Sequence, residues 1–302
     1  MDRKKTLILG NDQWNGQVSV YDLGLLRDGD SLEKGEIWSF PCGHYAGLKY
    51  RENTPFGDVI LTGGTMSYMV SYPSKEVLWS TDQSGNNTHS VEILPSGNIV
   101  LANSTGNDLR LFRTSALLAK DRETARTYTS YPFFCTHGVL WDPVYQCLWV
   151  YGDNDLAAWR VVGEGVDERL EPIEGKIYSL AAFGNAGHDL VPDPADPRYL
   201  YCTPRNGVLR FNKETGTFES HLLREMGHFK AFFPAEDGSY FLFANNDKSK
   251  HRRDLSSWWK GDWCVDHVGI LRFSEDGTVL ETRIYAEKAA FYKVRSFYGR
   301  YL

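Results

Sequence analysis

The most constraining feature of this sequence is a short phrase that returns along the whole chain. In four places a His is followed six residues later by a Pro: His89 and Pro95, His137 and Pro143, His188 and Pro194, and His228 and Pro234. A similar segment opens at His44 without the Pro, and Tyr292 and Lys293 stand at the sixth position. A spacing of about 40 to 50 residues between copies is typical of repeat folds, in which each copy forms one supersecondary unit.

Each copy contains four short runs rich in β-branched and aromatic residues, separated by Gly, Asn and Asp. After His89 these runs read SVEIL, NIVLAN, DLRLF and RTYTSYPF. Four antiparallel strands in each repeat describe the blade of a β-propeller, which protects its sheet edges by radial repetition. The sequence therefore predicts an all-β, six-bladed β-propeller that spans residues 1–302 as a single domain. The chain begins with three such runs and ends with one, so both termini are expected to complete the last blade.

Composition and charge narrow the possible partners. The chain has 302 residues, of which 42% are hydrophobic, and a net charge of −6, so we expect no binding to nucleic acid through bulk electrostatics. Its five Cys are scattered without C-x-x-C spacing, which indicates reduced thiols. The apolar run at the N-terminus is too short for a signal peptide, and no run approaches the roughly 20 apolar residues of a membrane span. We therefore expect a cytoplasmic protein without a membrane partner.

The repeated His predicts a metal centre. The first strand of a propeller blade lines the central channel, so a His at its start in five of six blades predicts a ring of imidazoles at one channel mouth. Imidazole is the commonest ligand of divalent metals, and three or four with an open position suit Zn, Mn, Fe or Ni. We predict metal binding by His89, His137 and His188, and substrate contacts by His44 and His228. A purely structural role of these imidazoles is the alternative.

The loops between second and third strands are expected to surround this ring. They predict substrate contacts by Trp14, Asn103 and Asp153, and a contribution from Arg205 to catalysis. An insertion at about 245–266 is rich in Trp and basic residues, and we interpret it as a lid; a strap packed against the propeller is the alternative. Arg presents a planar fork to carboxylates and Trp a flat face to sugar rings. The predicted substrate contacts in the insertion are Arg252, Arg253, Trp258 and Trp259.

The layout of the blades and the His-rich site resembles β-propeller proteins that act on carbohydrates, and in particular the oligogalacturonate lyases. In that family a divalent metal held by His neutralises a uronate carboxylate while a base removes the C5 proton. The resemblance covers architecture and the character of the site. The family is seven-bladed and has a closely spaced His pair that is absent here, so no residue is carried over by position.

Three functions remain open from the sequence. The first is a metal-dependent lyase acting on an acidic, uronate-containing oligosaccharide, with Lys293, Tyr292 or a metal-free His as base and Arg205 stabilising negative charge. The second is a non-catalytic propeller that binds sugars or proteins, a common use of such folds. The third is a hydrolase of glycosides, esters or lactones that uses a metal-activated water.

Overall fold

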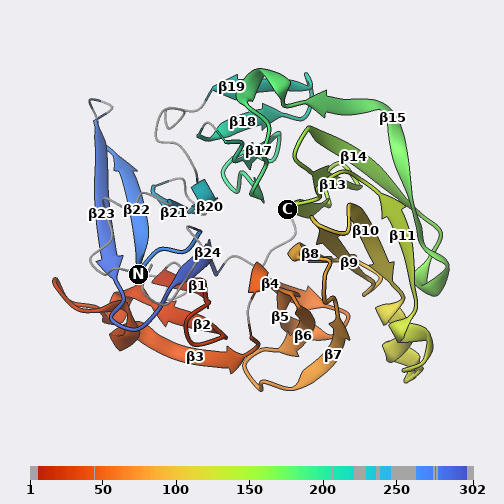
Figure 1. Cartoon of the computed structure of the whole chain (residues 1–302), viewed down its shortest axis with the longest axis horizontal. Helices are drawn as coiled ribbons and strands as arrows, with labels where there is room; N and C mark the ends of the chain where they lie inside the picture. Colours follow the sequence, from red (N-terminus) through yellow and green to blue (C-terminus); the bar gives the residue numbers. More distant parts are fainter. Residues whose placement is uncertain are drawn as a thin grey trace. The chain divides into compact units, whose positions relative to one another are not determined.

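The computed structural model describes residues 6–43, 45–205, 207–220, 229–235, 239–245, 263–274, 276 and 278–297. In these residues the strands β1 to β24 form six four-stranded antiparallel sheets (Figure 1). In each sheet the strands follow one another as a meander, which is the strand order of a propeller blade. The predicted all-β, six-bladed β-propeller is therefore confirmed.

The described chain divides into two compact units. Unit 1 comprises residues 6–43 and 191–297, and unit 2 comprises residues 45–190. Each unit is described by itself below. Nothing in this division tests the predicted single domain, which stays a prediction.

Unit 1 contains the sheet that joins the two ends of the chain. Strand β24 pairs antiparallel with β1, with Gly10 opposite Val294, so the last strand of the chain completes the blade that its first three strands begin. The strands of this unit are β1 (Leu7–Asp12), β2 (Gln17–Asp22), β3 (Glu36–Pro41) and β24 (Phe291–Ser296); β16 (Leu190–Pro192), β17 (Tyr199–Cys202), β18 (Leu209–Asn212) and β19 (Thr217–Ser220); and β20 (Phe229–Pro234), β21 (Phe241–Asn245), β22 (His267–Phe273) and β23 (Val279–Tyr285).

Unit 2 contains three complete blades and most of the short 3-10 helices. Its strands are β4 (Tyr45–Thr54), β5 (Gly57–Gly64), β6 (Met66–Ser71) and β7 (Val77–Asp82); β8 (Thr88–Ile93), β9 (Ile99–Asn103), β10 (Asp108–Phe112) and β11 (Tyr128–Pro132); and β12 (Gly138–Asp142), β13 (Cys147–Tyr151), β14 (Asp155–Val162) and β15 (Arg169–Ser179). The helices are η4 (Thr114–Ala119), η5 (Thr124–Arg126), η6 (Gly165–Asp167) and η7 (Ala181–Phe183), and unit 1 has η2 (Leu23–Leu25) and η3 (Leu32–Gly35).

A buried ion cluster joins the first strands of the three blades in unit 2. The carboxylate of Glu92 on β8 accepts hydrogen bonds from Lys49 Nζ at 2.9 Å and from Arg51 Nε and Nη2 at 2.9 and 2.7 Å, both from β4. It also accepts the backbone N–H of Trp141 on β12 at 3.3 Å. Burial alone would raise the pKa of Glu92, but the charges of Arg51 and Lys49 outweigh it and hold this pKa below its usual range. The cluster thus stabilises the contact between three blades.

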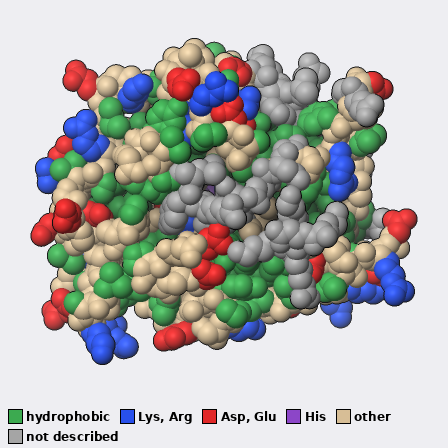
Figure 2. All heavy atoms as spheres, turned by 180° about the vertical axis from the view of Figure 1, so that it is seen from behind, with side chains coloured by type: hydrophobic (Ala, Val, Ile, Leu, Met, Phe, Trp, Pro, Cys, Tyr) green, Lys and Arg blue, Asp and Glu red, His purple; other side chains and the backbone are tan. Residues whose placement is uncertain are grey.

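Charges of both signs are mixed on the surface. Figure 2 shows Lys and Arg side chains interspersed with Asp and Glu in small groups over the face that it draws. The expectation that the chain binds no nucleic acid stays a prediction. No helix in the described residues is long and apolar enough to cross a membrane.

Candidate metal centre

Three of the predicted imidazoles lie next to one another in unit 2. His89 is the second residue of β8, His137 directly precedes β12, and His188 lies two residues before β16. The ring centroids of His89 and His137 are 4.2 Å apart, and those of His137 and His188 are 5.5 Å apart. His89 and His137 are each 7% exposed, whereas His188 is half-buried. Successive first strands therefore bring these three side chains together.

A repeated backbone turn precedes each of the three His. The residue two positions before the His adopts a left-handed conformation in every case, with φ of 52° at Asn87, 48° at Cys135 and 57° at Ala186. In the first two copies the carbonyl of this residue lies beside the ring: the Nδ1–O distance is 2.9 Å for His89 and 2.8 Å for His137. The local chain conformation therefore fixes the orientation of these two imidazoles.

These hydrogen bonds decide the tautomer of both rings. A backbone carbonyl can only accept, so Nδ1 of His89 and of His137 carries the proton, and in the neutral ring Nε2 keeps its lone pair. Metal-ligating His side chains commonly donate their other ring N–H to a backbone carbonyl or carboxylate in this way. Both rings are therefore prepared to bind a cation through Nε2.

The spacing of the rings also suits a shared ion. With metal–nitrogen bonds of about 2.0–2.1 Å, two imidazoles on one ion have ring centroids roughly 4.5–5.3 Å apart. The two observed spacings of 4.2 and 5.5 Å lie on either side of this range. In the described residues the three ligand atoms that lie within 4.8 Å of one another are those of Cys135, His137 and Asp153, so His89 and His188 would have to move toward His137 before all three imidazoles could share one ion.

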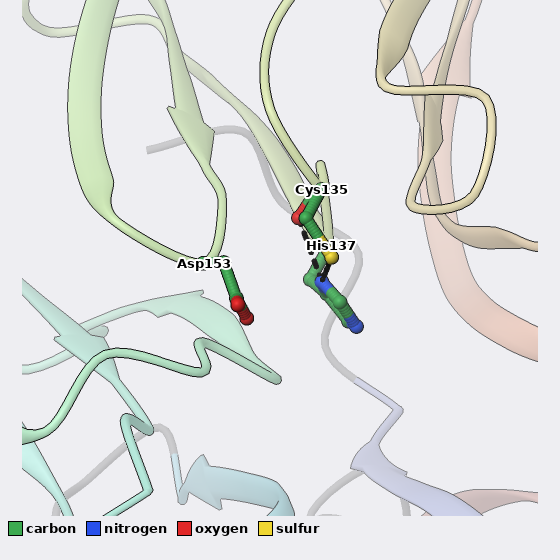
Figure 3. Close-up of side chains that lie close together, drawn as sticks. All are labelled: Cys135, His137 and Asp153. Carbon is green, nitrogen blue, oxygen red and sulfur yellow. Dashed lines mark hydrogen bonds between the residues drawn. The ribbon is translucent and has the colours of Figure 1, made fainter.

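A thiol and a carboxylate also lie beside His137. The Sγ atom of Cys135 is 3.8 Å from His137 Nδ1, and one ligand atom each from Cys135, His137 and Asp153 lie within 4.8 Å of one another (Figure 3). Asp153 comes from the β13–β14 loop, one of the loops predicted to surround the imidazoles. Burial, together with the Asp153 carboxylate, raises the pKa of the Cys135 thiol, which is therefore protonated near neutral pH.

Sequence reasoning missed Cys135, because a lone Cys has no ligand spacing. Its place in the repeat is the signal that was available: it occupies the left-handed position two residues before His137, as Asn87 does before His89. The residue two positions before the His therefore orients the imidazole through its backbone carbonyl. In the copy at Cys135 it also brings a sulfur atom next to the ring.

Asn103, predicted to contact substrate, is fully buried at the end of β9. Its Oδ1 accepts a hydrogen bond from Thr88 Oγ1 at 2.6 Å, and its Nδ2 donates to Asp108 Oδ1 at 2.8 Å. Both ends of the amide are thus engaged within one blade. This arrangement favours a role in holding the strand ends beside His89 over direct contact with a substrate.

Four other predicted site residues belong to unit 1. Lys293 is 1% exposed and Tyr292 is 5% exposed on β24, where both backbone N–H groups donate to Asn11 Oδ1. Arg205 is exposed, and Trp14 is 42% exposed. Their catalytic and substrate-binding roles stay predictions.

The remaining predicted contacts lie outside the described residues. They are His44, His228, Arg252, Arg253, Trp258 and Trp259. The complete ring of five imidazoles and the lid at about 245–266 therefore also stay predictions.

Comparison with known proteins supports the fold. No family model matches the chain, and no curated protein matches its sequence. A protein of unknown function from Bacteroides caccae aligns with a TM-score of 0.57 at 10% identity, covering 96% of this chain and 97% of that one. A functionally unknown protein from Desulfotomaculum acetoxidans aligns with a TM-score of 0.57 at 11% identity, covering 98% and 100%. A protein from Lactobacillus plantarum aligns with a TM-score of 0.55 at 9% identity, covering 93% and 85%. At these identities the likeness concerns the fold alone.

Proposed function

We propose that unit 2 binds a divalent transition metal through His89, His137 and His188, and that the protein is a metal-dependent enzyme acting on an acidic saccharide. The observation that carries this proposal is that two adjacent imidazoles are each oriented by a hydrogen bond to a backbone carbonyl. Their Nδ1 protons are directed to backbone carbonyls, so in the neutral rings each Nε2 atom carries the lone pair that can bind a metal. The third ring lies beside them. Mn, Zn, Fe and Ni all suit such a nitrogen-rich donor set.

The reaction we propose is β-elimination on a uronate. A base takes the C5 proton, the C–H electrons form the C4–C5 double bond, the C4–O bond breaks, and the leaving oxygen takes up a proton. A bound metal supplies positive charge that neutralises the uronate carboxylate and makes the C5 proton more acidic. The protein's own part is to hold the ligand rings rigidly and to accept the proton.

Asp153 is the proton acceptor that we assign in unit 2. It is half-buried, so its carboxylate remains accessible, and it lies beside His137. A carboxylate in reach of the reacting carbon serves as general base when the carbon acid is activated by a neighbouring charge. Lys293 and Tyr292 are buried on β24 and become the alternative bases if replacing Asp153 leaves turnover intact.

The first test measures metal content by elemental mass spectrometry on protein purified without a His-tag. We expect near-stoichiometric metal in the wild type and a loss of most of it in His89→Gln and His137→Gln, because each variant removes one nitrogen donor. Glu174→Gln, an exposed substitution in the same unit, serves as the matched control and keeps its metal. Thermal unfolding of each variant separates loss of ligand from loss of fold.

The second test follows product formation on oligogalacturonates. The proposed elimination yields a 4,5-unsaturated uronide with a new ultraviolet absorbance, whereas hydrolysis yields saturated ends without it. Asp153→Asn is expected to retain metal and lose turnover. If the wild type holds no metal even after reloading, the metal-dependent mechanism is wrong. The imidazoles then have a structural role, and the protein is a non-catalytic binding propeller.

A further inference from the structure

An exposed aromatic side chain lies in the loop that leads to the candidate metal centre of unit 2. Phe134, between β11 and β12, is 59% exposed and is the most exposed aromatic side chain among the described residues. Its neighbour Phe133 packs edge-on against Trp159, with ring centroids 6.4 Å apart. Single exposed apolar side chains are common on protein surfaces, so the position of Phe134 decides its meaning.

The backbone of Phe134 lies between two segments of the candidate centre. Cys135 follows it directly in the chain, and its carbonyl oxygen lies against Gly152, the residue before Asp153. A Cβ at Gly152 would overlap this oxygen and would lie 2.9 Å from the ring of Phe133. Because Gly152 has no side chain, the β11–β12 loop lies directly on the start of the β13–β14 loop. Phe134 is thus held next to the thiol and carboxylate beside His137.

Hydrogen bonds fix the backbone on both sides of Phe134. The N–H of Phe133 donates to the carbonyl of Asn107 at 3.0 Å, and the N–H of Cys135 donates to Oδ1 of the same Asn107 at 2.8 Å. Thr136 Oγ1 donates to the carbonyl of Phe133 at 2.7 Å. The exposed ring is therefore carried by an anchored loop, and a ligand that covers it would have little backbone freedom to remove.

The ring of Phe134 offers a flat apolar surface without a polar atom. Such a surface matches the C–H bonds on one face of a pyranose ring, whereas the hydroxyl and carboxylate groups at the rim of the sugar need polar partners. The half-buried Asp153 and the imidazoles provide polar groups in the same region. Small-molecule sites typically combine an apolar wall with a few polar groups in this way.

We propose that Phe134 forms a stacking subsite for a sugar ring beside the metal centre, which selects ligands that have an apolar pyranose face. This inference rests on the proposed function, because the saccharide is held at the centre of unit 2. Phe134 orients the ring and takes no part in proton transfer or metal binding. Its replacement therefore weakens saccharide binding and leaves the metal content unchanged.

The test uses metal-loaded full-length protein and isothermal titration calorimetry with galacturonate, which has no glycosidic bond to cleave. Phe134→Ala is expected to weaken binding about three- to tenfold at unchanged metal content and unfolding temperature. Phe134→Tyr keeps the flat ring and the affinity, whereas Phe134→Leu keeps an apolar side chain without the flat ring and binds as weakly as Phe134→Ala. Leu118→Ala is the matched control: Leu118 is 55% exposed in η4, at the other end of β11, and its loss leaves the affinity unchanged.

Kinetics on oligogalacturonates give a second readout, in which Phe134→Ala raises KM and leaves kcat nearly unchanged. The inference is wrong if folded Phe134→Ala binds galacturonate like the wild type, if Phe134→Leu binds as tightly as Phe134→Tyr, or if Leu118→Ala weakens binding as much as Phe134→Ala. A wild type that holds metal but binds no galacturonate overturns the proposed substrate class, and this inference with it. Failure of the subsite alone is thus seen in the variants, and failure of the proposed function is seen in the wild type.

Discussion

Units 1 and 2 carry different side chains near the starts of their first strands. In unit 2 the first strands begin beside His89 and His137, whose rings are held by backbone carbonyls. In unit 1 the corresponding strands carry Lys230 near the start of β20 and Lys293 near the start of β24. The fold of the blade therefore sets the position of a side chain, and the residue type sets whether it offers a neutral imidazole nitrogen or a positively charged amine.

The two regions also differ in how buried charge is balanced. In unit 2 the buried cations Lys49 and Arg51 are neutralised by Glu92, so the first strands that carry the imidazoles rest on a compensated ion cluster. In unit 1 the buried Asp12 carboxylate accepts hydrogen bonds from the backbone N–H of Trp14 and from Asn15 Nδ2. The buried charges of unit 2 are thus neutralised by ion pairs, whereas the buried carboxylate of unit 1 is stabilised by hydrogen-bond donors without charge.

Replacing Glu92 is expected to have the largest effect on this comparison. Glu92→Gln leaves Lys49 and Arg51 buried with one negative charge fewer, which should cost about 3–5 kcal/mol of unfolding free energy. Urea denaturation at neutral pH measures the change. Glu171→Gln removes an exposed partner of Arg169 and serves as control, with an expected loss of at most about 1 kcal/mol. Equal losses in the two variants would contradict the idea of a rigid base beneath the imidazoles.

The pH dependence of stability gives a second test of the role of Glu92. Because the pKa of Glu92 is lowered by folding, its stabilisation is fully present above the pKa of the unfolded chain and is lost as pH falls through the folded value. The stability difference between wild type and Glu92→Gln should therefore shrink in strongly acidic solution. A difference that stays constant down to the acid limit would show that Glu92 acts through shape and not through charge.

Replacing Asn103 is expected to have an intermediate effect. Asn103→Ala removes the amide that links Thr88 to Asp108 and leaves their polar groups without it, so a loss of about 1–3 kcal/mol in stability is expected. Thermal and urea unfolding measure this loss, and substrate or sugar affinity should not change. Asn154→Ala in the exposed β13–β14 loop is the control for stability. A weakened affinity at unchanged stability would restore the substrate-binding role predicted for Asn103.

The smallest effect on stability is expected from Lys230, and its titration tests the character of unit 1. Trace acylation followed by peptide mass spectrometry should show the amine becoming reactive with a midpoint near pH 8, whereas a model lysine peptide titrates near about 10.4. A midpoint equal to that of the model peptide would remove the electrostatic difference between the units.

The sign of the linked stability follows from the same shift. Between pH 8 and the ordinary lysine value of 10.5 the unfolded chain binds more protons than the folded chain at this position, so stability should rise with pH across this window. Lys230→Met should remove this contribution to the slope.

Much of the fold could be predicted from the sequence, because it follows from local patterns. Short β-branched runs and their turn residues predict the strands, the period of the His-to-Pro phrase predicts six blades, and three initial runs with one final run predict the pairing of β24 with β1. The placement of His89, His137 and His188 at the starts of successive first strands predicts their proximity. These inferences need only chain order and the period of two residues in a strand.

The chemistry of the sites depended on the backbone conformation beside each residue and on contacts that the sequence does not show. Which nitrogen of His137 carries the proton is decided by the left-handed turn at Cys135, and the direction of Asn103 by its hydrogen bonds to Thr88 and Asp108. Lys49 meets Glu92 only because neighbouring blades pack together. The sequence alone thus determined the repeat, the strands and the positions of the imidazoles, because these follow from local periodicity. Only the folded structure decided the tautomers, because these depend on the turn before each His, and the charge balance and altered pKa of Lys230, because these depend on burial and on charges from other parts of the chain.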